Sequence, residues 1–349
     1  MGPVSADSDK AAKKTDKRPT ATGRRAAVTI YDVARHAGVS PSTVSRALGK
    51  PGRMSARMER RIQDAAAELG YRVNPMARAL PTGRTHTLGL IVTDFTNPVY
   101  FDLVRGAERA AGVAGCTMVL AESQESGEAE SNAVERVRPL VDGLVLAAPR
   151  LDDEALTAIA QDTSLVLINR VVPDIASVVV DVRDGLTAAL DHLRAHGHGS
   201  IGYLSGPARS WINARRWEVL LEEAPRRGMH VVEIQTSEPT LAGGRDALRR
   251  VRAAGVSALV AYNDLIAIGL LREAQATGLN VPGDLSIVGF DDIFGAELTT
   301  PGLSTIRVPL GALGEAAIHV LIGRVNPEEH EPAKTEFVRR QSTGPAAAR

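Results

Sequence analysis

Several apolar runs of this 349-residue chain end in polar residues whose types suit binding better than bond breaking. Carboxylate and amide oxygens accept hydrogen bonds, whereas amide and guanidinium groups donate them. Each such residue also has a structural interpretation, because Asp and Asn cap the helix that follows a strand. As a set, with Phe95, Tyr100 and Phe101 and the stretch SWINARRWE (210–218) nearby, they favour a small polar ligand such as a sugar. The residues are Asp94, Asn169, Arg170, Asp181, Asn263, Asp264, Asp291 and Asp292.

Catalytic motifs are not evident in the same chain. It has no G-x-S-x-G, P-loop or H-E-x-x-H motif, and no G-x-G-x-x-G follows the first apolar run. His192, His196 and His198 lie close together, but no acidic or thiol partner accompanies them, so we expect neither a metal nor a cofactor. Cys116 heads an apolar run and is expected to be a buried thiol. A sugar-modifying enzyme would need a nucleophile or a carboxylate pair, and none can be named.

The polar residues must be positioned by apolar runs that alternate with helical stretches such as RDGLTAALDHLRAHGH (183–198). That alternation predicts an α/β fold with parallel sheets covered by helices. About ten strands exceed one small sheet, so we predict two lobes with a cleft, in which a ligand binds outside the carboxyl ends of the strands. The expected strands are 88–94, 116–122, 142–148, 165–169, 177–181, 200–206, 230–235, 258–264, 285–292 and 303–308.

A helical region precedes this body, over residues 28–73. Thr29, Ser40 and Ser55 stand at the starts of three predicted helices, and Gly38 and Gly70 end the first and the third. Apolar residues recur at helical spacing within each, which predicts a small shared core. Two short helices joined by a tight turn that contains glycine, followed by a third, predict a helix-turn-helix. A generic three-helix bundle is the alternative.

The outer face of the second predicted helix favours a DNA-binding role. Pro41 suits its first position, and Ser42, Ser45 and Arg46 lie opposite its apolar stripe. Residues 1–84 carry 17 Lys+Arg against 7 Asp+Glu, whereas the rest of the chain carries 24 against 34. A basic front end on an acidic body suggests that only the front end meets a polyanion.

The ends of the chain carry no targeting signal that we recognise. The first 27 residues contain no apolar signal core, and no window approaches the ~18 apolar residues of a membrane span, so we expect a cytoplasmic protein that does not enter membranes. We expect residues 1–27 to be a disordered basic tail, with a weak phosphate-binding arm as the alternative. Residues 341–349 are expected to be flexible.

The stretches VTIYDVARHAGVSPSTVSRALG (28–49) and ELGYRVNPMARAL (68–80) strongly resemble the LacI/GalR family of bacterial transcription regulators, and the similarity runs to about residue 340. The resemblance implies a helix-turn-helix domain over 28–73, a hinge helix and linker over 74–84, and a two-lobed body over 85–340. The body is similar to periplasmic sugar-binding proteins. The implied function is a repressor that binds a double-stranded, pseudo-palindromic operator as a homodimer and is controlled by a small ligand, expected to be a carbohydrate.

The resemblance also assigns residues to DNA. Arg46 is expected to pair with guanine, since its fork reaches O6 and N7 together. Asn74 can cap a short helix with Pro75 at its first position, and Ala77 and Leu80 then share one face. In the family this leucine is pushed between base pairs from the minor groove. The matching positions are Pro41, Ser42 and Arg46 for base edges, Thr29, Tyr31, Ser45 and Asn74 near phosphates, and Ala77 and Leu80 in the hinge.

For the ligand, the resemblance points to Asn169, Arg216, Asn263 and Asp291. The arginine is ambiguous, because Val219 stands where the family usually has glycine, so Arg215 is the alternative. Whether the ligand induces or corepresses stays open. The rival function is a sugar-binding transport-type protein with no DNA role, which would require a secretion signal and would not explain the basic first 84 residues.

Overall fold

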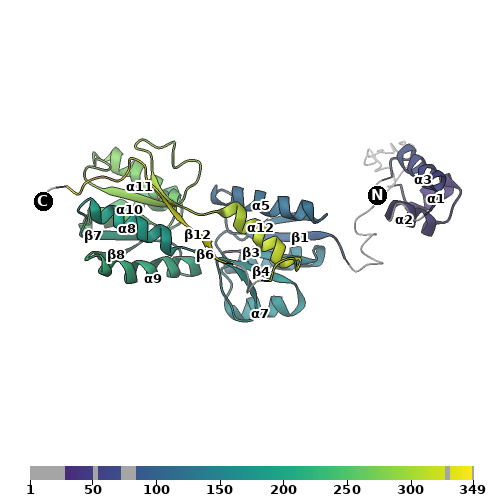
Figure 1. Cartoon of the computed structure of the whole chain (residues 1–349), viewed down its shortest axis with the longest axis horizontal. Helices are drawn as coiled ribbons and strands as arrows, with labels where there is room; N and C mark the ends of the chain where they lie inside the picture. The colour runs from purple at the N-terminus through teal and green to yellow at the C-terminus, as the bar shows by residue number, and fades with distance from the viewer. Residues whose placement is uncertain (1–27, 50–53, 72–83, 327–330, 348–349) are drawn as a thin grey trace, which may run out of the picture. The chain divides into compact units, whose positions relative to one another are not determined.

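The computed structural model describes residues 28–49, 54–71, 84–326 and 331–347. The chain divides into two compact units, residues 1–78 and 79–349 (Figure 1). The predicted hinge positions Asn74, Ala77 and Leu80 and the predicted tail 1–27 lie outside the described residues. Nowhere in the described ranges is there a helix of the length and apolar character that crossing a membrane requires.

The first unit contains the three predicted helices, α1 (Ile30–Ala37), α2 (Pro41–Gly49) and α3 (Ala56–Glu68). Their shared core is made of small and β-branched side chains, among them Val33, Val44 and Ile62, which are fully buried. Gly38 ends α1 in the left-handed region at φ 62°, as the tight turn to α2 requires. The predicted helix-turn-helix topology is therefore confirmed.

The first lobe of the second unit is built on a parallel sheet, which has the order β2-β1-β3-β4-β5 in the described part of the chain. Apolar side chains alternate along β1: Leu90 belongs to the same buried cluster as Leu103 of α5, and Ile91 belongs to a second cluster with Val134 of α6. The elements are β1 (Thr87–Val92), α5 (Val99–Val113), β2 (Thr117–Glu122), α6 (Gly127–Val137), η1 (Arg138–Leu140), β3 (Gly143–Ala147), α7 (Asp153–Asp162), β4 (Leu165–Ile168) and β5 (Ala176–Val178).

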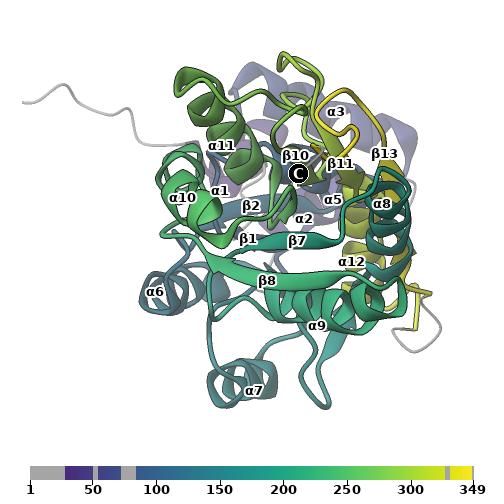
Figure 2. The ribbon, with the colours of Figure 1, turned by 90° about the vertical axis from the view of Figure 1, so that its left-hand side faces the viewer.

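The second lobe has a mixed sheet with the order β13-β11-β10-β9-β7-β8 among the described strands. Helices α8 and α9 cover one face and α10 and α11 the other (Figure 2). Strand β13, which pairs antiparallel with β11, was not predicted. The elements are α8 (Arg183–Ala195), β7 (Ser200–Ser205), α9 (Trp211–Arg226), β8 (His230–Gln235), α10 (Leu241–Ala254), β9 (Ala258–Ala261), α11 (Asp264–Ala276), β10 (Ser286–Asp291), β11 (Ser304–Arg307) and β13 (Glu336–Val338).

The chain passes from lobe to lobe at three places within the described ranges. β6 (Val180–Asp181) carries it to α8, the segment after β11 returns it to α12 (Leu310–Leu321) in the first lobe, and β12 (Ala333–Lys334) takes it back. β6 and β12 pair side by side in parallel between the lobes (Figure 1). The single strand predicted over 177–181 is therefore wrong, because the chain leaves the first sheet after Val178 to make this crossing.

The C-terminal segment differs from its expected flexibility. Ser342 and Thr343 are buried in the second lobe. The Ser342 hydroxyl donates to the carbonyl of Ile287 at 2.6 Å and accepts from the backbone N–H of Ser304 at 2.8 Å. His198 lies within hydrogen-bonding distance of the Gly344 carbonyl, with Nε2 at 3.0 Å. The segment is ordered because its polar groups form hydrogen bonds with the backbone of β10 and β11. Apolar periodicity in the sequence does not reveal such hydrogen bonds.

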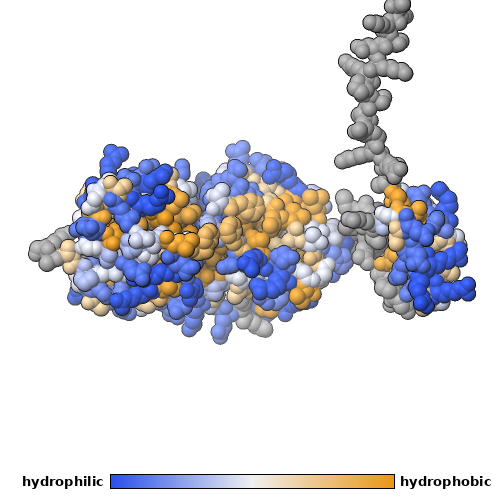
Figure 3. Space-filling model, turned by 90° about the horizontal axis from the view of Figure 1, so that it is seen from above, coloured by the Kyte–Doolittle hydropathy of each residue, from blue (hydrophilic) through white to orange (hydrophobic). Residues whose placement is uncertain are grey.

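Large apolar side chains remain exposed on the second unit. Phe101 and Val113 of α5 are 52% and 72% exposed, and Phe294 and Leu298, in the turn after β10, are 63% and 72% exposed. Hydrophobic surface is visible on both lobes when this unit is seen from above (Figure 3). Contiguous apolar patches on a protein surface commonly mark a site of interaction.

The pairing of α5 with α12 leaves no room for a β-carbon at Gly106, where an added Cβ would lie 2.0 Å from the carbonyl oxygen of Gly311. We expect Gly106→Ala to lower the free energy of unfolding by about 1–3 kcal/mol, as overpacking does. Gly112→Ala, on the same helix but with no atom within 4 Å of the added Cβ, should be neutral or stabilising. Urea unfolding of both variants checks this, and equal effects would contradict the tight helix contact.

Candidate functional site

The helix α2 presents the face that the sequence assigned to DNA. Ser42, Ser45 and Arg46 are exposed, and Pro41 occupies the first helical position. The Ser40 hydroxyl accepts from the backbone N–H of Thr43 at 3.3 Å, so Ser40 caps the helix as predicted. Arg46 Nε donates to the carbonyl of Ser42 at 3.3 Å. Because this hydrogen bond lies on the exposed helix surface, the guanidinium can leave it for another acceptor at little cost.

Thr29, at the start of α1, has a structural role in addition to its predicted position near a phosphate. The hydroxyl and the N–H of Thr29 both donate to the Asp32 carboxylate, at 2.7 and 2.9 Å. These hydrogen bonds lower the pKa of Asp32. Tyr31 is 66% exposed. Thr29 therefore fixes the helix start, and Tyr31 has a side chain that can meet a partner.

In the second unit, polar residues from both lobes line one cavity of about 50 Å³. Drug-sized ligands occupy pockets of roughly 300–1,000 Å³, so this cavity is smaller than such a ligand and suits a few waters. The sequence-predicted residues brought together here are Tyr100, Asn169, Arg216, Asn263 and Asp291. The other lining residues are Asn97, Val99, Leu103, Glu125, Ala147, Ala148, Ile168, Ile212, Pro239, Tyr262, Val308 and Leu310.

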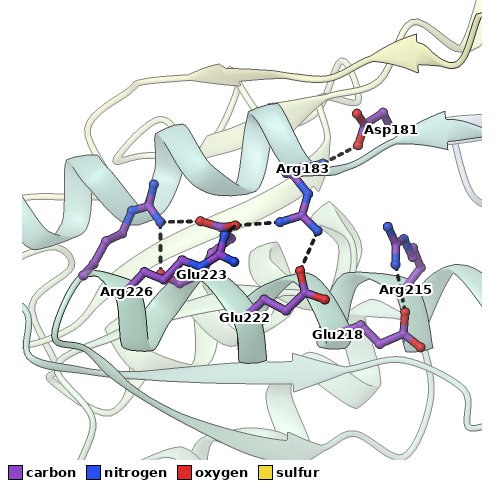
Figure 4. A network of polar contacts seen from close by, with 8 residues as sticks. Asp181, Arg183, Arg215, Glu218, Glu222, Glu223 and Arg226 are labelled. Carbon is purple, nitrogen blue, oxygen red and sulfur yellow. Dashed lines mark hydrogen bonds and ion pairs between the residues drawn. The ribbon is translucent and has the colours of Figure 1, made fainter.

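Arg216 occupies the second-lobe side of this cavity and is only 4% exposed. Its guanidinium carbon lies 3.5 Å from the centroid of the Phe290 ring, and its NH2 atom donates to Oδ1 of Asp291 at 3.4 Å. Its NH1 atom donates to the carbonyl of Tyr262. Arg215 instead pairs with Glu218 at 3.1 Å on the surface of α9 (Figure 4). Of the two arginines that the sequence left open, Arg216 is the one at the cavity.

The Asp291 carboxyl is strongly affected by its surroundings. Burial raises its pKa to about 7, and Arg216 acts in the opposite direction. Because this folded-state pKa lies above the ordinary value of 3.8, the group stabilises the fold fully below about pH 4, and that contribution is lost as the pH rises through 7. Burial also raises the pKa of Asp264 behind it, which accepts from Thr305 Oγ1 at 2.6 Å and from the N–H of Ile293 at 2.8 Å.

The other predicted residues at the cavity also have local structural roles. Asn169 accepts from the N–H of Val180 at 3.2 Å and has a φ of 53°. Asn263 caps α11 by accepting from the N–H of Ile266 at 2.9 Å. The capping and the lining interpretations therefore both hold for Asn263, because a helix that starts at a cleft presents its cap to the cleft.

Phe95 and Phe101 are not among the residues that line this cavity, so their place beside the ligand stays a prediction. Phe95 is 40% exposed, and Phe101 lines an adjoining open groove that also contains Phe294. The reason is geometric: one residue on a helix turns by about 100°, so Tyr100 faces the cavity and Phe101 faces away.

Glu125 and Arg150 were missed by sequence reasoning. Glu125 lines the cavity, and Arg150, only 4% exposed, pairs with it at 2.6 Å. Glu125 follows the strand-end run 116–122 by three residues, so extending the strand-end rule past that run would have found it. Arg150 follows the run 142–148 by two residues, so the same extension would have found it, although its burial depends on the fold of the loop after β3.

Two protein-family models match the chain. Residues 29–74 match the bacterial regulatory proteins, lacI family, and residues 190–343 match the periplasmic binding protein-like domain. The HTH-type transcriptional regulator GalS of Salmonella typhimurium is 34% identical over 303 residues, which cover 84% of this chain and 89% of the relative. The ribose operon repressor of Escherichia coli is 32% identical over 316 residues, which cover 85% of this chain and 93% of the relative.

Solved structures extend this likeness to three dimensions. A crystal structure of the lac repressor dimer bound to operator and the anti-inducer ONPF has a TM-score of 0.80 at 25% identity. The match covers 91% of this chain and 99% of that chain. The likeness thus includes both the helix-turn-helix unit and the two-lobed unit.

The contact between Arg216 and Asp291 can be tested by titration. Since Arg216 opposes the effect of burial, Arg216→Met should raise the pKa of Asp291 further above about 7. Arg215→Met, which removes the neighbouring exposed guanidinium, should leave that pKa in place. Carbon-13 NMR of the aspartate carboxyl groups across pH measures both variants. An unchanged Asp291 titration in Arg216→Met would show that the two groups do not interact.

Proposed function

The chain belongs to the lacI family of bacterial regulatory proteins and is a DNA-binding transcription regulator rather than an enzyme, and we propose that it is a repressor controlled by a small ligand. It binds a pseudo-palindromic operator as a homodimer, with one α2 helix in each of two successive major grooves. The ligand occupies the cavity between the lobes. This places the protein with the chromosomal DNA in the cytoplasm, in association with the nucleoid. The rival transport-type interpretation loses its basis, because the chain matches transcription regulators over 89% and 93% of their length.

The observation that carries this proposal is the exposed polar face of α2, which has no role in the core of its own unit. Arg46 and Ser42 form its base-reading edge together with Pro41, and Tyr31, Thr29 and Ser45 lie toward phosphates. Arg46 has the fork geometry that pairs with a guanine. Asn74, Ala77 and Leu80 complete the DNA interface in this proposal by bending the duplex from the minor groove.

The ligand proposed for the cavity is a carbohydrate. Its support is the set of donors and acceptors contributed by Tyr100, Asn169, Arg216, Asn263 and Asp291 from two lobes. A ligand that binds between the lobes changes the populations of the DNA-bound and the free protein only if its affinity for these two forms differs. The small volume of the cavity supports such a difference, because a sugar does not fit in about 50 Å³ without a movement of the lobes.

Arg46 can be tested with operators selected from a random DNA pool by the full-length protein. We expect Arg46→Ala to lose about 1–3 kcal/mol of discrimination between the selected and a scrambled sequence. Arg60→Ala removes the same charge from the exposed surface of α3 and should keep the ratio of the two affinities. Band shifts at fixed salt measure both ratios. A preserved ratio in Arg46→Ala would remove this residue from the base-reading face.

The homodimer is proposed to form through the exposed apolar surface of the second unit, which includes Phe294 and Leu298. We expect the double substitution Phe294→Ser with Leu298→Ser to shift the protein toward monomers in sedimentation at micromolar concentration, since the loss of apolar burial weakens association. Leu221→Ser, at a leucine of α9 that is 48% exposed, is the matched control and should leave the dimer intact. A shift toward monomers in Leu221→Ser, with an intact dimer in the double variant, would instead place the interface on the surface of α9.

A further inference from the structure

Each of the two carboxylates that line the cavity forms an ion pair with a buried arginine. Glu125 from the first lobe pairs with Arg150 at 2.6 Å, and Asp291 from the second lobe pairs with Arg216 at 3.4 Å. The charged lining residues are Glu125, Arg216 and Asp291 within the described chain, and Arg150 lies directly behind Glu125. Each of these two carboxyl groups is therefore paired with its own arginine before any ligand enters the site.

The Glu125–Arg150 pair is held rigidly. Gln124 and Glu125 both adopt left-handed backbone conformations, with φ of 51° and 57°. Such conformations persist only where the surrounding structure imposes them. Arg150 NH1 donates to the carbonyl of Ala148 at 2.7 Å, and the N–H of Arg150 donates to the buried Glu130 carboxylate at 2.6 Å. The orientation of Glu125 is thus fixed by the fold rather than by the ligand.

The helix starts at the cavity are already capped by the protein. Helix N-termini commonly bind phosphate through free N–H groups. Here Asn97 accepts from the N–H of Val99 at 3.2 Å at the start of α5, and Asn263 accepts from the N–H of Ile266 at 2.9 Å at the start of α11. Both asparagines line the cavity, so amide oxygens stand where an anion would otherwise bind.

One donor at the cavity remains unused. The Nε atom of Arg216 is buried and has no hydrogen-bond partner among the described residues. A ligand must therefore offer an acceptor to Arg216 and donors to the two carboxylates. A hydroxyl group can do either, since it donates one hydrogen bond and accepts two.

We propose that the cavity takes an uncharged polyhydroxylated ligand, and that Glu125, positioned by Arg150, excludes phosphorylated and acidic forms of that ligand. The inference rests on the proposed function only in placing the effector in this cavity. A phosphate would bring further negative charge beside two carboxyl groups whose arginines are already paired, at helix starts that are already capped, and burying an unpaired charge is costly. Glu125 is thus a specificity-determining residue on the first lobe, facing Asp291 on the second.

Calorimetry with the full-length protein tests the ligand class. The probes are D-glucose, D-galactose and D-ribose, each compared with its ester: glucose 6-phosphate, galactose 1-phosphate and ribose 5-phosphate. We expect at least one neutral sugar to bind, and its ester to bind at least 100-fold more weakly. An ester that binds as tightly as its sugar overturns the proposal, and so does the failure of all three neutral sugars to bind.

The role of Glu125 is tested by Glu125→Gln, which keeps the shape of the side chain and leaves the charge of Arg150 uncompensated. The affinity ratio of sugar to ester should fall at least tenfold. Glu128→Gln, at an exposed position of α6 three residues further on, is the matched control and should leave the ratio unchanged. A merely structural role of Glu125 would weaken both probes alike, so an unchanged ratio in Glu125→Gln overturns its assignment.

Band shifts on the same preparations separate this inference from the proposed function. Sequence-selective DNA binding by Glu125→Gln shows that the variant is folded. Intact DNA binding together with tight binding of an ester means that only the ligand class is wrong. If the unaltered protein does not bind DNA selectively, the proposed function is wrong. The ratio of the sugar affinity to the ester affinity then still decides the ligand class.

Discussion

The two-lobed unit depends on the short parallel pairing of β6 with β12, because these strands carry the chain between the lobes. Thr335 reinforces the crossing: its buried hydroxyl donates to the carbonyl of Asp181 and accepts from the N–H of Gly185, at 2.9 and 3.0 Å. Loop ends at the carboxyl edges of the two sheets can line one cavity only because the crossings keep those edges facing each other. The positions of Asn169 and Asp291 on opposite walls follow from that arrangement.

Desolvation determines what this cavity can do. Its volume of about 50 Å³ leaves Arg216 and Asp291 largely out of water, so their charges act strongly on each other and on anything that enters. In the proposed function the lobes part to admit the ligand and close on it, because the cavity is smaller than a sugar. The geometry of the lobes is then tied to the chemistry of the bound molecule.

The sequence predicted much of this, and the failures have physical causes. Helix caps, apolar periodicity and strand-end polar residues are local signals, so α2 with its exposed Arg46 and the cavity residues Asn263 and Asp291 could be predicted. The pairing of Arg150 with Glu125 could not be predicted, since the two lie 25 residues apart and the burial of Arg150 is a tertiary property. The packed C-terminal segment and β13 were missed for a related reason: their hydrogen bonds go to strands formed much earlier in the chain.

The crossing pattern has a consequence for biosynthesis. Helix α12, which completes the first lobe, and β13, which completes the edge of the second, both lie after residue 309. During synthesis, the core of the first lobe and the sheet edge of the second therefore stay incomplete until these late elements have left the ribosome. The helix-turn-helix unit precedes both lobes in the chain, so it can fold while the two-lobed unit is still incomplete.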